Sequence, residues 1–205
     1  MNIWLKLTVL TAALVVAASA AAQAVVGQTA PAFVLSDTQG RPVKLADFKG
    51  KHLVLEWVNP GCPYVQKHYD SGNMPATQKA ARGKDVVWLA INSTATEHRD
   101  YRKPADLDAW LKGKDSAMSA TLMDVDGKAG RAYGARTTPH MYVIDPQGKL
   151  VYAGAIDSIA SANTADIKSA TNYVNQALGE LLAGKAVSKP TSQAYGCSIK
   201  YASAG

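Results

Sequence analysis

Cysteine is scarce in this 205-residue sequence, which contains only Cys62 and Cys197. No zinc-type cluster of cysteine and histidine is present, so a structural zinc site is not expected. The sequence also lacks a Gly-rich phosphate loop and a G-x-S-x-G motif, the signatures of P-loop nucleotide binding and of α/β-hydrolase catalysis. The net charge is +6, but the basic residues are scattered and form no run interleaved with aromatics. Nucleic acid is therefore not an expected partner.

The N-terminus has the pattern of a secretory signal. Lys6 precedes the apolar stretch 7–20, and small residues at the A-x-A spacing follow over 21–24. The apolar core of about 14 residues is short for a membrane span of roughly 20, although an uncleaved membrane anchor remains the alternative. We expect a signal peptide over 1–24, cleaved after Ala24 or, as second choice, after Ala20. The remaining domain, 25–205, would be periplasmic or secreted in a bacterium, with no other membrane segment.

Export would place the two cysteines in an oxidising compartment, which affects the roles that they can have. Thiols in an oxidising compartment usually pair, and Cys62 and Cys197 are the only candidates. They can form a redox couple or a permanent structural bridge, or each can react with another molecule. The sequence alone leaves these three cases open.

Apolar runs and turn residues predict an alternating α/β order that ends in a hairpin and a helix. Strand 52–58 is apolar on both faces, as in a central strand of a sheet covered on both sides. A mixed sheet with helices on both faces is expected. The predicted strands are 52–58, 85–92 and 119–124, and hairpins are predicted over 33–51 and 140–157. One helix is predicted to begin at Cys62 and Pro63. Further helices are predicted over 74–84, 103–114, 127–135 and 164–184. The tail 185–205 has no strong period.

Three segments carry a resemblance to a known family. They are "GQTAPAFVLSDTQGRPVKLADFKGKHLVLEWVNPGCP", "TTPHMYVIDPQGKLVYAG" and "LLAGKAVSKPTSQAYGCSIKY". Together, and in this order, they resemble the thioredoxin-like superfamily in its redoxin branch, of the alkyl hydroperoxide reductase/thiol-specific antioxidant type. The last segment resembles a peroxiredoxin-like subgroup that ends in G-C-S-I-K.

The resemblance implies an α/β thioredoxin-like fold, with a central mixed sheet flanked by helices, an N-terminal hairpin and a C-terminal tail. It implies an exported thiol–disulfide oxidoreductase that uses Cys62 as reactive thiolate, with Cys197 as the resolving thiol. The partner would be a thiol or disulfide protein or a small thiol, and no cofactor is expected. The oligomeric state stays open.

Cys62 stands where a strand is expected to end and a helix to begin. The partial positive charge of a helix N-terminus favours a thiolate there, and the thiolate is the attacking species in disulfide exchange. A thioredoxin would carry its second cysteine at the position of Val65, which cannot resolve a mixed disulfide. If the tail folds back, Cys197 can take that role, or the two cysteines can form a permanent structural disulfide; if it does not, each cysteine reacts with another molecule.

Further site residues follow from the same resemblance. Pro139 matches the thioredoxin cis-proline, which would face Cys62 while Thr138 offers backbone to a substrate peptide; an ordinary trans proline is the alternative. Glu56 matches a buried acid, and burial would raise its pKa so that it could carry a proton during exchange. The alternative for Glu56 is a strand-edge side chain that reaches solvent.

Residues flanking Cys62 complete the predicted site. Pro63, Tyr64 and Trp57 are candidate substrate contacts, although aromatic residues more often serve packing. Lys67 and His68 lie one turn along the helix. They could favour the thiolate, but a solvated position is the favoured interpretation.

Departures from the family pattern keep other functions open. Asn59 and Leu55 stand where peroxiredoxins carry Thr and Pro, and Pro139 stands where they carry an Arg. Peroxide reduction is therefore an alternative to disulfide exchange, and the less favoured one.

A non-enzymatic role is the third possibility. The chain would then be a redoxin-fold binding protein or a copper-handling protein. Copper would bind Cys62, His140 and, as second sulfur, Cys197. No metal site is predicted as the main expectation.

Overall fold

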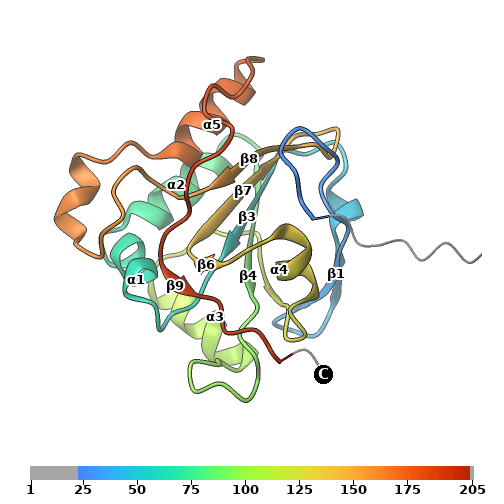
Figure 1. Ribbon diagram of the computed structural model, residues 1–205, viewed down its shortest axis with the longest axis vertical. Helices are drawn as coiled ribbons and strands as arrows, with labels where there is room; N and C mark the ends of the chain where they lie inside the picture. Colours follow the sequence, from blue (N-terminus) through green and yellow to red (C-terminus); the bar gives the residue numbers. More distant parts are fainter. Residues whose placement is uncertain (1–22, 204–205) are drawn as a thin grey trace, which may run out of the picture.

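The computed structural model describes residues 23–203 of the chain, and within them strands and helices alternate largely as the sequence predicts (Figure 1). The elements in chain order are β1 (Val34–Asp37), β2 (Pro42–Lys44), the 3₁₀ turn η1 (Leu45–Phe48), β3 (Leu53–Trp57), α1 (Pro63–Asp70), α2 (Asn73–Arg82), β4 (Val87–Asn92), α3 (Pro104–Gly113), β5 (Ala120–Met123), α4 (Lys128–Tyr133), β6 (Thr137–Thr138), β7 (His140–Ile144), β8 (Leu150–Gly154), the 3₁₀ turn η2 (Thr164–Lys168), α5 (Tyr173–Leu182) and β9 (Cys197–Ser198).

A seven-stranded mixed sheet forms the centre, in the order β2-β1-β5-β4-β3-β7-β8. Strands β3, β4 and β5 are parallel, whereas β7 and β8 form the predicted hairpin and β7 runs antiparallel to β3. β3 is buried along its whole length, as its two-sided apolar sequence predicts. The chain therefore has the expected thioredoxin-like mixed α/β fold.

Side chains of each strand alternate between two cores, one on each face of the sheet. Helices α1, α2, α3 and α5 bury their apolar faces on one side, and Cys62 lies in that core. Helix α4 and the chain before β1, including Ala30 and Phe33, cover the other side, where Trp57 and Tyr142 are buried.

The last helix is shorter than predicted. The sequence predicts one helix over 164–184, but only η2 and α5 form, and the chain between them is not helical. The side chain of Asn172 caps α5 by accepting a hydrogen bond from the Asn175 N–H, and the Tyr173 N–H donates to the Ile156 carbonyl. These bonds hold Asn172 in an extended conformation, although the helical spacing of apolar residues runs through this position. The helix therefore starts at Tyr173.

The tail, which has no sequence period, crosses the molecule from α5 past β6 (Figure 1). Its strand β9 pairs antiparallel with β6 in a second, two-stranded sheet. The predicted signal peptide falls almost wholly on residues 1–22, outside the described part. Within 23–203 no helix has the length and apolar character needed to span a bilayer.

Candidate functional site

Cys62 is the N-cap residue of α1. Its extended backbone, with φ −89° and ψ 121°, leads from the loop after β3 into the helix, and Pro63 occupies the first turn. The Cys62 N–H donates to the Asn59 carbonyl over 3.0 Å, and the Gln66 N–H donates to the Cys62 carbonyl over 2.9 Å. The predicted strand-to-helix junction is confirmed. An anion at this cap faces the positive end of the helix dipole.

The sulfur of Cys62 is enclosed by backbone from two distant segments. Its thiol donates to the Thr138 carbonyl over 3.0 Å, and the Cys197 N–H donates to its sulfur over 3.3 Å. The Thr138–Pro139 peptide bond is cis, as predicted. Cys62 is only 1% exposed. The tail thus covers the sulfur, and Cys62 and Cys197 lie side by side as free thiols.

Cys197 holds its proton more tightly than an ordinary thiol. Burial, followed by the hydrogen bond and charge of neighbouring Cys62, raises its pKa to about 12, while Lys200 acts in the opposite direction. In the reduced protein Cys197 is therefore a neutral thiol at physiological pH.

The predicted substrate contacts differ in how accessible they are. Pro63 is exposed, and Tyr64 is half-buried with its ring edge-on to Tyr195 at 5.8 Å. Thr138 is only 4% exposed, and its backbone pairs with β9. The surface beside Cys62 is therefore formed by Pro63 and Tyr64, whereas the backbone of Thr138 is already occupied.

Trp57 does not line this surface. It is completely buried on the opposite face of the sheet, where its indole N–H donates to the Ser93 hydroxyl over 2.9 Å. The alternation of side chains along β3 explains the error, because residue 57 points away from the face that carries Cys62. The predicted substrate contact of Trp57 is wrong.

Glu56 is fully buried and accepts three hydrogen bonds. Tyr69 donates to one carboxylate oxygen over 2.8 Å, while Trp88 and Gln78 donate to the other over 2.8 and 3.1 Å. Burial raises the pKa of Glu56 to about 7, although these hydrogen bonds lower it. Glu56 stands two residues after Val54 on β3, so both side chains lie on the same face of the sheet, toward the core that contains Cys62.

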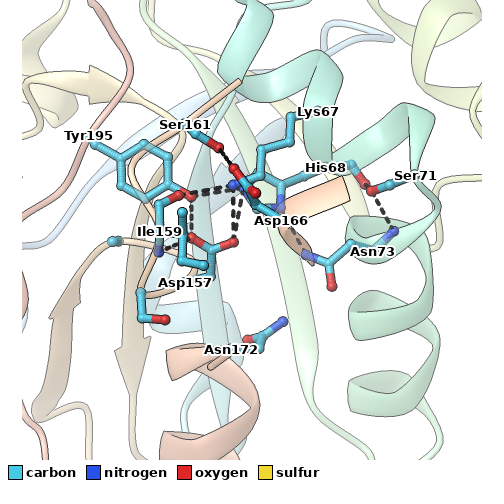
Figure 2. Close-up of polar contacts among 12 residues, drawn as sticks. Lys67, His68, Ser71, Asn73, Asp157, Ile159, Ser161, Asp166, Asn172 and Tyr195 are labelled. Carbon is cyan, nitrogen blue, oxygen red and sulfur yellow. Dashed lines mark hydrogen bonds and ion pairs between the residues drawn. The ribbon is translucent and has the colours of Figure 1, made fainter. Parts of the chain in front are cut away.

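Lys67 and His68 are buried, not solvated, and this part of the prediction is wrong. The Lys67 ammonium lies 3.4 Å from the Asp157 carboxylate and donates to the Ile159 carbonyl over 2.9 Å. The Tyr195 hydroxyl also donates to Asp157 and lies 3.1 Å from the His68 ring (Figure 2). Burial lowers the pKa of His68 to about 4, so the ring is neutral beside the ion pair.

Sequence reasoning missed Asp157 and Tyr195, the partners of this buried cluster. Asp157 follows the β7–β8 hairpin, and Tyr195 stands two residues before Cys197 in the tail. Neither lies near Lys67 in the chain, and only the fold brings them together. Two cues were present: a Tyr close to a candidate cysteine, and a lysine within the apolar periodicity of α1.

His140 does not join the two cysteines. Its ring is tilted against that of Tyr142, with the centroids 4.6 Å apart, and its Nδ1 lies 3.3 Å from the Arg136 backbone nitrogen and 3.2 Å from the Tyr142 hydroxyl. Burial lowers its pKa to about 4. Among residues 23–203 no three His, Cys, Asp or Glu side chains gather as metal ligands, so the copper set predicted from Cys62, Cys197 and His140 is not assembled.

Comparison with known proteins gives one family match. The family model described as AhpC/TSA matches residues 26–153. This range includes Cys62 and Pro139 but ends before the tail.

Individual relatives are distant. A thiol-disulfide oxidoreductase ResA of Bacillus thuringiensis subsp. konkukian is 25% identical over 126 residues, which is 62% of this chain and 67% of the relative. A hypothetical protein from Sinorhizobium meliloti 1021 is similar in structure, with a TM-score of 0.73 and 25% identity over 88% of this chain and 96% of the other. An uncharacterized conserved protein from Geobacillus kaustophilus matches with a TM-score of 0.74 and 26% identity over 88% and 94%.

Proposed function

The chain belongs to the AhpC/TSA family, and on this basis we propose that it is a thiol–disulfide oxidoreductase in which Cys62 is the nucleophile and Cys197 the resolving thiol. The hydrogen bond from the Cys197 N–H to the Cys62 sulfur is the observation that carries this proposal. The naming of distant relatives as thiol-disulfide oxidoreductases supports it. The substrates are disulfides or thiols.

The first step is attack by the Cys62 thiolate on one sulfur of a substrate disulfide. The substrate S–S bond breaks, one half leaves as a thiolate, and the other half stays bound to Cys62 as a mixed disulfide. The N-cap position on α1 and the Cys197 N–H both favour the attacking anion.

The second step is attack by Cys197 on the Cys62 sulfur. Cys197 loses its proton, a Cys62–Cys197 disulfide forms, and the second half of the substrate leaves as a thiolate. Two protein thiols have then been oxidised and one substrate disulfide reduced. A partner dithiol reverses the reaction and restores both thiols, and the relative reduction potentials set the direction.

Glu56 is the proposed proton acceptor coupled to these steps. Its pKa of about 7 allows it to gain or lose a proton at neutral pH. It forms its hydrogen bonds with Tyr69, Trp88 and Gln78 and not with Cys62. Its influence on the thiol is therefore electrostatic: a proton on Glu56 removes a negative charge from the core that both share.

Within the family, we propose membership of the peroxiredoxin-like subgroup that ends in G-C-S-I-K. Peroxide reduction is less well supported than disulfide exchange. The Asn59 side chain accepts from the Gly61 N–H and donates to Thr94, so its amide is engaged in local bonds. Leu55 is buried on the face opposite Cys62. Neither residue offers a polar group to a peroxide.

Export by an N-terminal signal remains part of the proposal. Ala24 packs on the core, and its N–H donates to the Ala132 carbonyl over 2.8 Å. Cleavage after Ala20 keeps this contact and cleavage after Ala24 removes it, so we favour the earlier position. The mass of the mature protein recovered from a bacterial periplasm distinguishes the two.

Disulfide mapping with a redox titration tests the proposed function. We expect a Cys62–Cys197 bridge in the oxidised protein, with a reduction potential above about −300 mV. A bridge that resists reduction until the protein is denatured would identify a structural disulfide and refute the enzymatic role.

A further inference from the structure

The strand edge beside the reactive sulfur is already paired. β9 lies antiparallel to β6, with Thr138 opposite Cys197 and Thr137 opposite Ser198. The carbonyl that accepts from the Cys62 thiol thus belongs to a residue paired directly with Cys197. A cysteine in an extended segment is presented to Cys62 through backbone pairing, and that segment is the chain's own tail.

The tail is anchored before Cys197. The Tyr195 hydroxyl donates to Asp157, and the Tyr195 ring lies 5.5 Å from the Lys67 ammonium (Figure 2). Asp157 and Lys67 are almost completely buried, at 2% and 1% exposed. Because Lys67 lies on α1, the helix that Cys62 caps, this anchor fixes the tail relative to the reactive cysteine.

The tail is also anchored after Cys197. The Ile199 N–H donates to the Arg136 carbonyl over 2.9 Å, and the Ala95 N–H donates to the Lys200 carbonyl over 2.7 Å. These bonds hold the segment that follows β9 on two different parts of the chain. β9 is therefore a short strand that is held by contacts of the residues on both sides of it.

Gly196 permits the close approach of the tail. A Cβ atom at this position would lie 2.0 Å from the Thr138 carbonyl oxygen, and its φ of +137° is one that residues with a side chain rarely adopt. Any side chain at 196 therefore forces the tail away from β6. One substitution can thus release the strand pairing while both cysteines stay in the chain.

We propose that β9 is a built-in occupant of the β6 edge, and that the intact chain therefore reacts with small disulfides in preference to cysteines carried in extended peptides. An extended peptide binds such an edge by adding a strand. Here the peptide must first displace β9 and break the contacts that anchor the tail on either side of it. A small disulfide needs only local access to the Cys62 sulfur, next to exposed Pro63. This inference rests on the proposed function and selects its substrate class.

A single-turnover experiment separates strand competition from simple coverage. Two reagents with the same leaving group are compared: 5,5′-dithiobis(2-nitrobenzoic acid), and a short extended peptide whose central cysteine carries thionitrobenzoate. Cys62 attacks either disulfide, bonds to the small group or to the peptide cysteine, and releases coloured thionitrobenzoate. The Cys197→Ser background keeps the tail backbone and leaves Cys62 as the only thiol.

Gly196→Ala is then added to that background. We expect the rate with the peptide, relative to the rate with the small disulfide, to rise at least about tenfold, with faster hydrogen exchange at residues 197–199. Gly179→Ala is the matched control, since a Cβ there meets nothing within 4 Å and the ratio should not change. Tyr195→Phe loosens the anchor by another route and should raise the ratio in the same direction if Gly196→Ala fails to fold.

Three outcomes would overturn the inference. An equal rise in both rates would mean that the tail only covers the sulfur, and no rise in the peptide rate would mean that β9 does not exclude peptides. Failure of Cys62 to react with either reagent until the protein is denatured would refute both the proposed function and the substrate preference. In the first two cases the proposed function stands, because Cys62 still reacts.

Discussion

The backbone N–H of Cys197 donates to the sulfur of Cys62, although 135 positions separate the two residues in the sequence. β9 creates this contact by pairing with the strand that precedes cis-Pro139. A thiol held in this way has a high effective concentration for attack on a mixed disulfide at Cys62. Under the proposed function, Cys197 of the tail takes the role of a nearby resolving cysteine, which Val65 cannot provide.

Replacing Cys62 and replacing Cys197 should stop the reaction at different steps. We expect Cys62→Ser to reduce turnover of a small disulfide to the uncatalysed rate, because the proposed nucleophile is gone and burial keeps the remaining Cys197 thiol protonated. Cys197→Ser should still react once and then accumulate a mixed disulfide at Cys62, visible as added mass in the intact protein. Ser198→Ala, in the same strand, is the control and should turn over normally. Full turnover by Cys197→Ser would show that another thiol, from outside the chain, does the resolving.

Glu56→Gln should flatten the dependence of stability on pH. The pKa of Glu56 is raised from 4.5 to about 7 on folding, so between these pH values the folded state binds a proton that the unfolded state has lost. Glu56 therefore stabilises the fold less as pH rises, by up to roughly 3 kcal/mol, with no further change above pH 7. Gln can keep the three bonds, since its oxygen accepts from Trp88 and Gln78 and its NH₂ donates to Tyr69. Urea unfolding across this range tests it, and parallel curves for wild type and variant would contradict the buried-acid assignment.

Lys67→Met should destabilise the fold strongly. It leaves the Asp157 carboxylate buried without its cation, which costs about 3–5 kcal/mol. Adding Asp157→Asn should recover part of this loss, because the uncompensated charge is gone. Lys112→Met is the control: its side chain is 77% exposed, and its pair with Asp108 should contribute less than about 1 kcal/mol. Equal free energies of unfolding for the two single variants, measured with urea, would show that Lys67 is not a buried partner of Asp157.

Tyr195→Phe should slow the closing of the Cys62–Cys197 disulfide. The variant keeps the ring but loses the hydroxyl that bonds Asp157 and His68, so the tail is less firmly held beside Cys62. We expect a severalfold lower rate for the second step in rapid-quench measurements, with the first step unchanged or faster. Tyr133→Phe is matched to it, since it removes a hydroxyl bonded to the Pro31 carbonyl on the other face of the sheet. A similar slowing in both variants would indicate a general loss of stability and no positioning role for Tyr195.

Much of the fold was predictable because its signals are local. Two-sided apolar runs predict β3 and β4, Pro63 and Pro104 mark the starts of α1 and α3, and alternating residues around a turn predict the β7–β8 hairpin. The extended helix at 164–184 was predicted wrongly, since an Asn cap and tertiary backbone bonds interrupted a pattern that the apolar period alone could not resolve. Trp57 and Lys67 were misjudged for a related reason: their burial depends on which layer covers them.

The sequence by itself determined the thioredoxin-like order of elements, the junction that carries Cys62, and the candidate partners Cys197, Pro139 and Glu56. Only the tertiary structure decided that the aperiodic tail returns to Cys62. Its anchors are single hydrogen bonds between residues far apart in the chain, and a two-residue strand such as β9 leaves no period to read. Such contacts depend on where the packed sheet brings distant segments together, and no local preference of the tail encodes that position.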